Sequence, residues 1–140
     1  MAKRILVIED DPVSSRLMEY ALEKQGYQVV TASNGLEGLK KVRAEGPDLV
    51  ILDIMLPGMD GFEICHRVRS ELPGKTLPIL ILSGKAQEAD KATGLRLGAD
   101  DYLVKPISPS TITTVVARLL ASSDGQEESV GVEEKKSGPG

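Results

Sequence analysis

Short apolar runs alternate along the chain with longer segments in which apolar positions recur at helical spacing. The runs at residues 4–8, 28–32, 48–53, 77–83 and 101–104 predict five strands. The segments at residues 12–25, 35–44, 62–72, 86–97 and 109–122 predict five helices. This alternation predicts an α/β fold in which a parallel sheet carries helices on both faces.

The first predicted helix has the clearest boundaries. Asp11 is suited to the N-cap, Pro12 to the first helical position, and Gly26 follows the end of the segment. One face of this helix is expected to pack on the sheet. The residues expected on that buried face are Val13, Leu17, Tyr20, Ala21 and the stem of Lys24.

Composition places the chain among ordinary globular domains. Its 140 residues are 41% hydrophobic and 27% charged, which is enough to build one core. The single cysteine, Cys65, excludes a disulfide within this chain and fits a reducing compartment. No apolar run approaches the roughly 20 residues of a membrane span, and the first residues lack the pattern of a signal peptide. We expect a cytoplasmic protein that does not enter a membrane.

The charge is concentrated at the C-terminal end. Residues 121–140 hold five acidic residues and two lysines, although the whole chain has a net charge of only −4. This stretch lacks aromatic residues and has too few apolar ones to offset the entropy of ordering it. We therefore expect residues 1–122 to form the domain and residues 123–140 to be a disordered acidic tail or linker. The weak negative charge argues against direct nucleic-acid binding.

Polar residues follow the predicted strands at their carboxyl ends, where function is usually located in such sheets. Glu9 and Asp10 follow the first strand, Asp53 ends the third, Ser83 ends the fourth and Lys105 follows the fifth. If the first and third strands are neighbours, three carboxylates converge, and they cannot all ionise without a compensating cation. Lys105 supplies one positive charge, and Mg²⁺ is the ion best suited to supply the rest.

This set of residues is suited to phosphoryl chemistry. An aspartate carboxylate can attack phosphorus and form an acyl phosphate. Lys105 and a metal ion would neutralise charge on the transferred group, and the Ser83 hydroxyl could donate a hydrogen bond to it. The sequence therefore predicts phosphorylation of Asp53.

Four stretches with their spacing, LVIEDD, DIMLPGMDG, the LS pair at 82–83 and GADDYLVKP, closely resemble the receiver domains of bacterial response regulators. The resemblance covers residues 3–121. It implies a flavodoxin-like, doubly wound five-stranded sheet of strand order 2-1-3-4-5 with five helices. For Mg²⁺ binding it implies Glu9, Asp10, Asp53 and the Met55 backbone carbonyl, and for phosphorylation Asp53. For catalysis and switching it implies Ser83, Tyr102 and Lys105. It also implies a cis peptide bond before Pro106.

The resemblance also implies a function in two-component signalling. The chain would take a phosphoryl group from a sensor histidine kinase or a histidine phosphotransfer protein. The phosphoprotein would then change the surface formed by the fourth helix, fifth strand and fifth helix, through which a downstream protein target binds. It would act as an element of a phosphorelay, catalysing only its own phosphorylation and dephosphorylation, and is not expected to be an enzyme otherwise.

Other functions fit the sequence less well or remain open. A haloacid-dehalogenase-type phosphatase needs a second acid where Met55 stands, and a dinucleotide-binding domain needs glycines where Glu9 and Asp10 stand. A degenerate receiver that serves only as an adaptor remains an alternative. So does the receiver part of a longer regulator whose output domain is not in this sequence.

Several polar residues have simpler interpretations. Asp11 is interpreted as a helix cap rather than a metal ligand, and Cys65 as a core residue. His66 is expected to face solvent. Asp100 and Asp101 are interpreted as a solvated turn, with a possible part in a partner surface.

Overall fold

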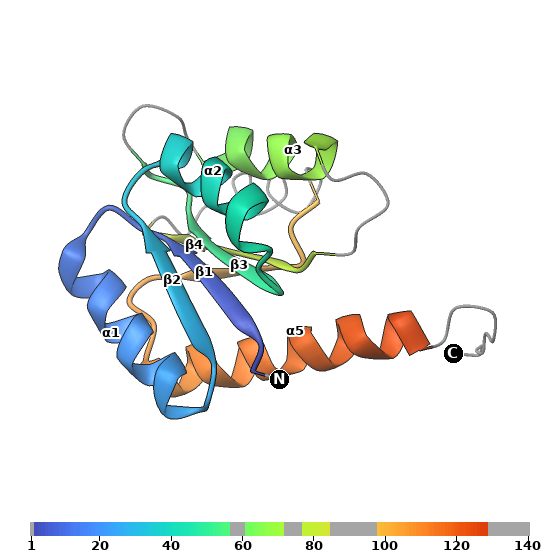
Figure 1. Ribbon diagram of the computed structural model, residues 1–140. Coiled ribbons are helices and arrows are strands. Elements are labelled where there is room, and N and C mark those ends of the chain that lie inside the picture. The colour runs from blue at the N-terminus through green and yellow to red at the C-terminus, as the bar shows by residue number, and fades with distance from the viewer. Residues whose placement is uncertain (1, 57–60, 72–76, 85–97, 129–140) are drawn as a thin grey trace.

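The computed structural model describes residues 2–56, 61–71, 77–84 and 98–128. Five parallel strands form one sheet in the order β2-β1-β3-β4-β5, which confirms the flavodoxin-like doubly wound fold (Figure 1). The strands are β1 (Arg4–Ile8), β2 (Gln28–Ala32), β3 (Leu49–Asp53), β4 (Ile79–Ser83) and β5 (Asp101–Val104). The described helices are α1 (Pro12–Lys24), α2 (Gly35–Glu45), α3 (Gly61–Glu71) and α5 (Pro109–Glu128). The further helix expected at residues 86–97 lies outside the described residues.

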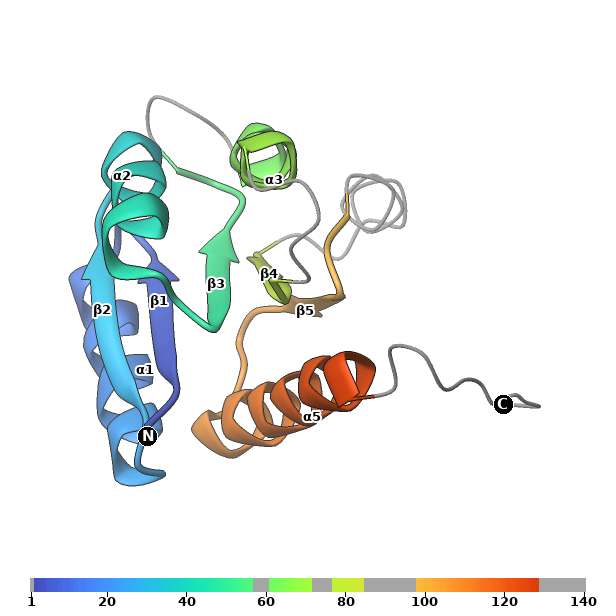
Figure 2. The same cartoon turned by 45° about the vertical axis from the view of Figure 1, so that its right-hand side comes forward.

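Helices cover both faces of the sheet, so the central strands are apolar throughout. Helices α1 and α5 pack on one face, and α2 and α3 pack on the other (Figures 1 and 2). Side chains along each strand alternate between the two cores. In β3, for example, Val50 and Leu52 join the core beneath α2 and α3, whereas Leu49 and Ile51 join the core beneath α1 and α5.

The helix boundaries are set by capping side chains, as the sequence predicts for α1. The Asp11 carboxylate accepts a hydrogen bond from the Val13 N–H, which makes Asp11 the N-cap of α1. Asn34 caps α2 in the same way by accepting from the Glu37 N–H. Gly46 is the C-cap of α2, and its φ of 58° is the left-handed conformation that glycine adopts without strain.

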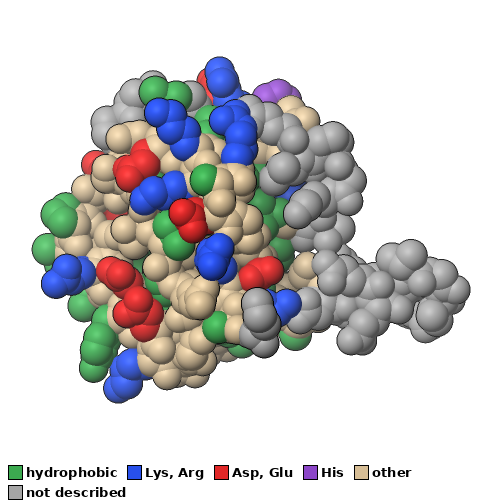
Figure 3. All heavy atoms as spheres, in the orientation of Figure 1, with side chains coloured by type: hydrophobic (Ala, Val, Ile, Leu, Met, Phe, Trp, Pro, Cys, Tyr) green, Lys and Arg blue, Asp and Glu red, His purple; other side chains and the backbone are tan. Residues whose placement is uncertain are grey.

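The predicted buried face of α1 is wrong. Met18 and Leu22 are the buried residues of this helix, whereas Val13, Leu17 and Tyr20 are 65%, 57% and 65% exposed. The helix carries two apolar stripes, and packing against the sheet and α5 selects the stripe that contains Met18 and Leu22. Hydrophobic side chains consequently gather on the surface along α1 (Figure 3).

Helix α5 is longer than expected. It ends at Glu128 rather than at Ser122, so residues 123–128 are helical in the structure. Gln126, Glu127 and Glu128 are good helix formers, and they outweigh the single glycine at position 125. Residues 129–140, which complete the predicted tail, lie outside the described residues. None of the described helices is both long enough and apolar enough to cross a membrane.

Candidate functional site

Hydrogen bonds that continue the sheet ladders position the candidate site residues. The Glu9 N–H donates to the Ala32 carbonyl at 3.0 Å, and the Lys105 N–H donates to the Ser83 carbonyl at 2.6 Å. Because Ile8 pairs with Leu52, the next residues along the two strands, Glu9 and Asp53, are brought side by side. The carboxyl edge of the sheet therefore brings together residues from β1, β3 and β5.

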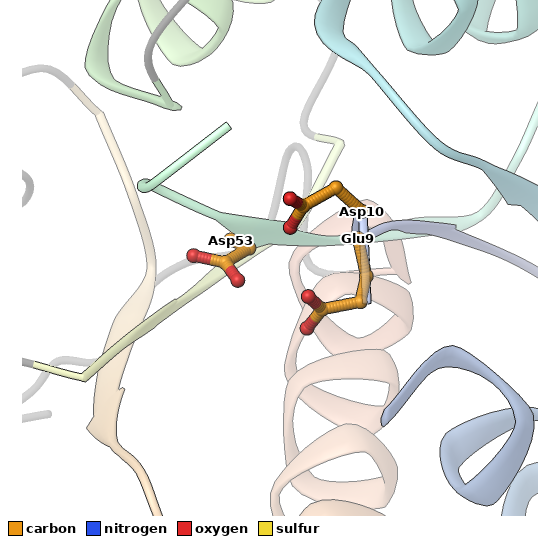
Figure 4. Close-up of side chains that lie close together, drawn as sticks. All are labelled: Glu9, Asp10 and Asp53. Atoms are coloured by element: carbon orange, nitrogen blue, oxygen red, sulfur yellow. The ribbon is translucent and has the colours of Figure 1, made fainter. Parts of the chain in front are cut away.

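Three carboxylates meet at this edge, as the sequence predicts. One oxygen from each of Glu9, Asp10 and Asp53 lies within 4.8 Å of the others. Their side chains converge on one region beyond the ends of β1 and β3 (Figure 4). Glu9 and Asp53 are only 3% and 5% exposed, whereas Asp10 faces solvent.

Lys105 joins the two buried carboxylates. Its Nζ donates to Asp53 Oδ2 at 2.8 Å and to Glu9 Oε1 at 2.9 Å. The other oxygens accept backbone hydrogen bonds, Asp53 Oδ1 from the Met55 N–H at 2.8 Å and Glu9 Oε2 from the Asp11 N–H at 3.1 Å. Every oxygen of the two buried carboxylates thus has a donor.

Burial and pairing shift the proton affinities of this cluster. Burial raises the pKa of the Glu9 carboxyl, and the hydrogen bonds from Lys105 and the Asp11 N–H only partly oppose this effect. Burial lowers the pKa of Lys105, but hydrogen bonds to Asp53 and Glu9 together outweigh it and leave that pKa above its ordinary value. Lys105 therefore stays charged between two acids, and burial makes ionisation of Glu9 costly.

The donor set fits a hard divalent cation. All side-chain donors of the cluster are carboxylate oxygens, which are the ligands that Mg²⁺ prefers. The formal charges of three carboxylates and the Lys105 ammonium sum to two negative charges. Within the described residues the exposed Asp10 carboxylate has no hydrogen-bond partner, so it can take a ligand at little cost. Glu9, Asp10 and Asp53 could therefore hold a divalent metal ion.

Of the remaining predicted site residues, Ser83 and Pro106 lie at the same end of the sheet, whereas Tyr102 lies farther back on β5, where it pairs with Ile81. Ser83 ends β4 and is fully buried. Tyr102, on the neighbouring strand β5, is 6% exposed, and its buried hydroxyl has no hydrogen-bond partner in the part of the chain that the structure describes. The Lys105–Pro106 peptide bond is cis, as expected. The functional roles predicted for Ser83 and Tyr102 remain predictions.

Sequence reasoning missed the partners of Asp100 and Asp101, which are not a simple solvated turn. Asp100 Oδ2 accepts from Arg69 at 2.9 Å and from the Ile79 N–H at 2.8 Å, which ties α3 to the start of β4. Asp101 forms an ion pair with Arg118 of α5. These partners are far apart in the sequence, so no local pattern indicates them. Cys65 is buried and His66 is exposed, as interpreted from the sequence.

An apolar groove of about 400 Å³ lies beside the acidic cluster, between α1 and the segment that joins β5 to α5. Its lining includes Leu17, Met18, Ile107 and Ile112, and Lys105 stands at its side. The exposed stripe of α1 continues from this groove through Leu17. The groove therefore offers an apolar surface next to the candidate site.

Comparison with known sequences identifies the family. The sequence profile of the response regulator receiver domain matches residues 5–117, and the chain belongs to this family. The chain is 47% identical over 124 residues to the alkaline phosphatase synthesis transcriptional regulatory protein PhoP of Bacillus subtilis. That match covers 89% of this chain but 51% of PhoP, so the chain spans about half the length of this relative.

Solved structures with the same fold agree with the family assignment. A CheY-like receiver domain protein from Methanospirillum hungatei superimposes with a TM-score of 0.85 and 29% identity, over 90% of this chain and 99% of its own. The BeF3-activated receiver domain of Klebsiella pneumoniae RstA superimposes with a TM-score of 0.78 and 33% identity, over 84% of this chain and 98% of its own.

Proposed function

We propose that this receiver domain accepts a phosphoryl group on Asp53, in the presence of Mg²⁺, from a phosphohistidine of a sensor kinase or phosphotransfer protein. The observation that carries the proposal is the position of Asp53. Its carboxylate is buried at the end of β3, held by Lys105 and the Met55 N–H, and placed beside two further acids. The family assignment supports the same function.

The transfer exchanges one bond to phosphorus for another. A carboxylate oxygen of Asp53 attacks phosphorus and forms an acyl phosphate, while the bond from phosphorus to the donor imidazole breaks and the imidazole leaves with that electron pair. Lys105, which is bound to Asp53 Oδ2, is placed to donate to the transferred group. Bound Mg²⁺ would neutralise charge on the phosphoryl oxygens. Glu9 and Asp10 supply the negative charge that holds such an ion near Asp53.

We further propose that the donor protein docks on the groove beside Lys105 and the exposed stripe of α1. A donor histidine has to reach Asp53, so the protein that carries it must contact the surface around this edge. Val13 and Leu17 are large apolar side chains that are more than half exposed there. Apolar surface of this kind, next to a reacting group, is typical of a protein contact.

The output of the phosphorylated form is proposed by analogy with longer relatives. PhoP is a transcriptional regulator about twice the length of the matched segment. We propose that this chain is the receiver part of such a regulator, or a separate receiver, and that it signals through the surface of β5 and α5. An adaptor that is never phosphorylated is the alternative, and it predicts no covalent product.

Mass spectrometry of the intact protein tests the proposal. After incubation with acetyl phosphate and MgCl₂, the protein should gain the mass of one phosphoryl group, and it should gain none when EDTA replaces MgCl₂. The Asp53→Asn variant should gain no mass under either condition. A phosphoryl group that persists in this variant would assign the reaction to another residue, and an unmodified wild type would favour the adaptor.

A further inference from the structure

Gly61, the first residue of α3, lies against the backbone that follows β3. Its N–H donates to the Ile54 carbonyl at 3.1 Å. A Cβ added at Gly61 would overlap the Ile54 Cα and would lie 2.9 Å from Ile54 Cγ2 and 3.0 Å from the Asp53 carbonyl oxygen. A side chain at position 61 therefore has no space unless the backbone moves.

The requirement for glycine at position 61 is steric rather than conformational. Gly26, Gly46 and Gly98 have positive φ angles, and Gly61 does not. Alanine is a better helix former than glycine, so without the overlap Gly61→Ala would leave the protein unchanged or more stable. The close approach to β3 is thus the feature that excludes other residues.

The backbone that Gly61 contacts is part of the candidate site. Ile54 stands between Asp53, which is expected to be phosphorylated, and Met55, whose N–H holds the Asp53 carboxylate. Displacing Ile54 displaces both neighbours, because the three residues share two planar peptide units. At Gly38, by contrast, the three atoms nearest to an added Cβ all belong to the side chain of Ile8, the nearest at 2.5 Å.

We propose that Gly61 is a positioning residue for the metal site: its bare Cα lets α3 begin directly on Ile54 and fixes the peptide units that orient the Asp53 carboxylate and the Met55 carbonyl. The inference rests on the Mg²⁺ site of the proposed function. It adds a residue that touches no ligand but decides whether two of the expected ligands are correctly placed.

Titration with MgCl₂, followed by amide NMR, tests this role in three proteins: wild type, Gly61→Ala and Gly26→Ala. Gly26 has a φ of 95° and lies after α1, at the opposite edge of the sheet, so its substitution should lower the melting temperature without changing Mg²⁺ affinity. Gly61→Ala should weaken Mg²⁺ binding by about tenfold or more, as substitutions that misplace metal ligands do. Its Met55 amide signal should also move in the absence of metal.

The outcomes separate this inference from the proposed function. A wild type that does not bind Mg²⁺ would refute the metal site itself. Equal affinity in the wild type and Gly61→Ala would refute the role of Gly61 alone. If Gly61→Ala does not fold, the wild-type titration decides: the Gly61 amide signal should shift with the same midpoint as that of Met55, while the Gly26 signal stays in place. A Gly61 signal that does not respond would overturn the proposal.

Discussion

At the scale of single residues, Lys105 is the cation that allows two buried acids to coexist. Its side chain is 29% exposed, and it bonds both Glu9 and Asp53, whose side chains are almost inaccessible. Removing one partner from a fully buried ion pair costs about 3–5 kcal/mol, and partial exposure reduces that cost. Lys105 and a bound metal ion should therefore compensate the same charges.

Replacing Lys105 with alanine should lower the unfolding free energy of the metal-free protein by about 1–3 kcal/mol. Saturating Mg²⁺ should restore more stability to this variant than to the wild type, because the ion then neutralises acids that have lost their lysine. Urea unfolding with EDTA or MgCl₂ measures both effects. Arg4→Ala is the control, since Arg4 pairs with Glu45 at the other end of β1 and its loss should be insensitive to Mg²⁺.

The raised pKa of Glu9 gives a prediction with a definite sign. Because burial raises this pKa in the folded state, the folded protein binds more protons than the unfolded chain above pH 4.5, the ordinary value for glutamate. The contribution of the Glu9 carboxyl to the unfolding free energy therefore decreases as the pH rises from 4.5 toward the pKa of the folded state. In EDTA, the melting temperature of Glu9→Gln relative to the wild type should increase from pH 4.5 to neutral pH.

Glu37 is a control for Glu9, because its pKa is shifted in the opposite direction. The Ser33 N–H bond lowers the pKa of Glu37, so its ionised form stabilises the fold above the ordinary pKa and this contribution is lost as the pH falls. Glu37→Gln should thus become more destabilising as the pH rises. If both variants respond to pH with the same sign, the burial of charge at Glu9 is not the cause.

At the scale of elements, the exposed stripe of α1 can be separated from the chemistry of Asp53. Leu17→Glu places a charge beside the apolar groove without touching the acidic cluster. Transfer from a phosphohistidine-bearing kinase domain that phosphorylates the wild type should slow at least tenfold, which corresponds to a loss of about 1.4 kcal/mol or more at the contact. Phosphorylation by acetyl phosphate should be unchanged, because this donor needs no docking surface.

Leu36→Glu is the matched control for Leu17→Glu. Leu36 is 62% exposed on α2, on the opposite face of the sheet from α1, and an acidic substitution there should affect neither donor. Equal rates for Leu17→Glu and the wild type with the kinase domain would show that the donor docks elsewhere. A loss of rate with acetyl phosphate as well would mean that the substitution disturbs the site itself.

The sequence predicts the elements better than it predicts their faces and long-range contacts. Strand order and the meeting of Glu9 with Asp53 follow from the alternation of strands and helices and from the resemblance. The buried face of α1 cannot be predicted in this way, because the helix has two apolar stripes. Which stripe is buried depends on the elements against which the helix packs. The contact between Arg69 and Asp100 cannot be predicted from a local sequence pattern, because the two residues are 31 positions apart.

At the scale of the whole molecule, the positions of Ser83 and Tyr102 indicate which of the two hydrophobic cores responds to phosphorylation. Strand alternation puts Ser83 on the α2–α3 face of the sheet with Ile81, and Tyr102 belongs to the core on that face. Tyr102 is buried, and its hydroxyl has no hydrogen-bond partner among the described residues. Because Tyr102 already lies in this core, a phosphoryl group that draws Ser83 toward Asp53 would change the packing around the Tyr102 ring. The ring would not have to move into a vacant position.

The isoleucine methyl groups can report which core responds. On addition of beryllofluoride, a mimic of the phosphoryl group, with MgCl₂, methyl NMR signals of Ile54 and Ile81 should shift, because these side chains share the core of Tyr102. Signals of Ile5 and Ile112, in the core beneath α1 and α5, should shift much less. Asp53→Asn should abolish the shifts, since the mimic needs the carboxylate. Larger shifts at Ile5 and Ile112 would place the switch in the core beneath α1 and α5 rather than around Tyr102.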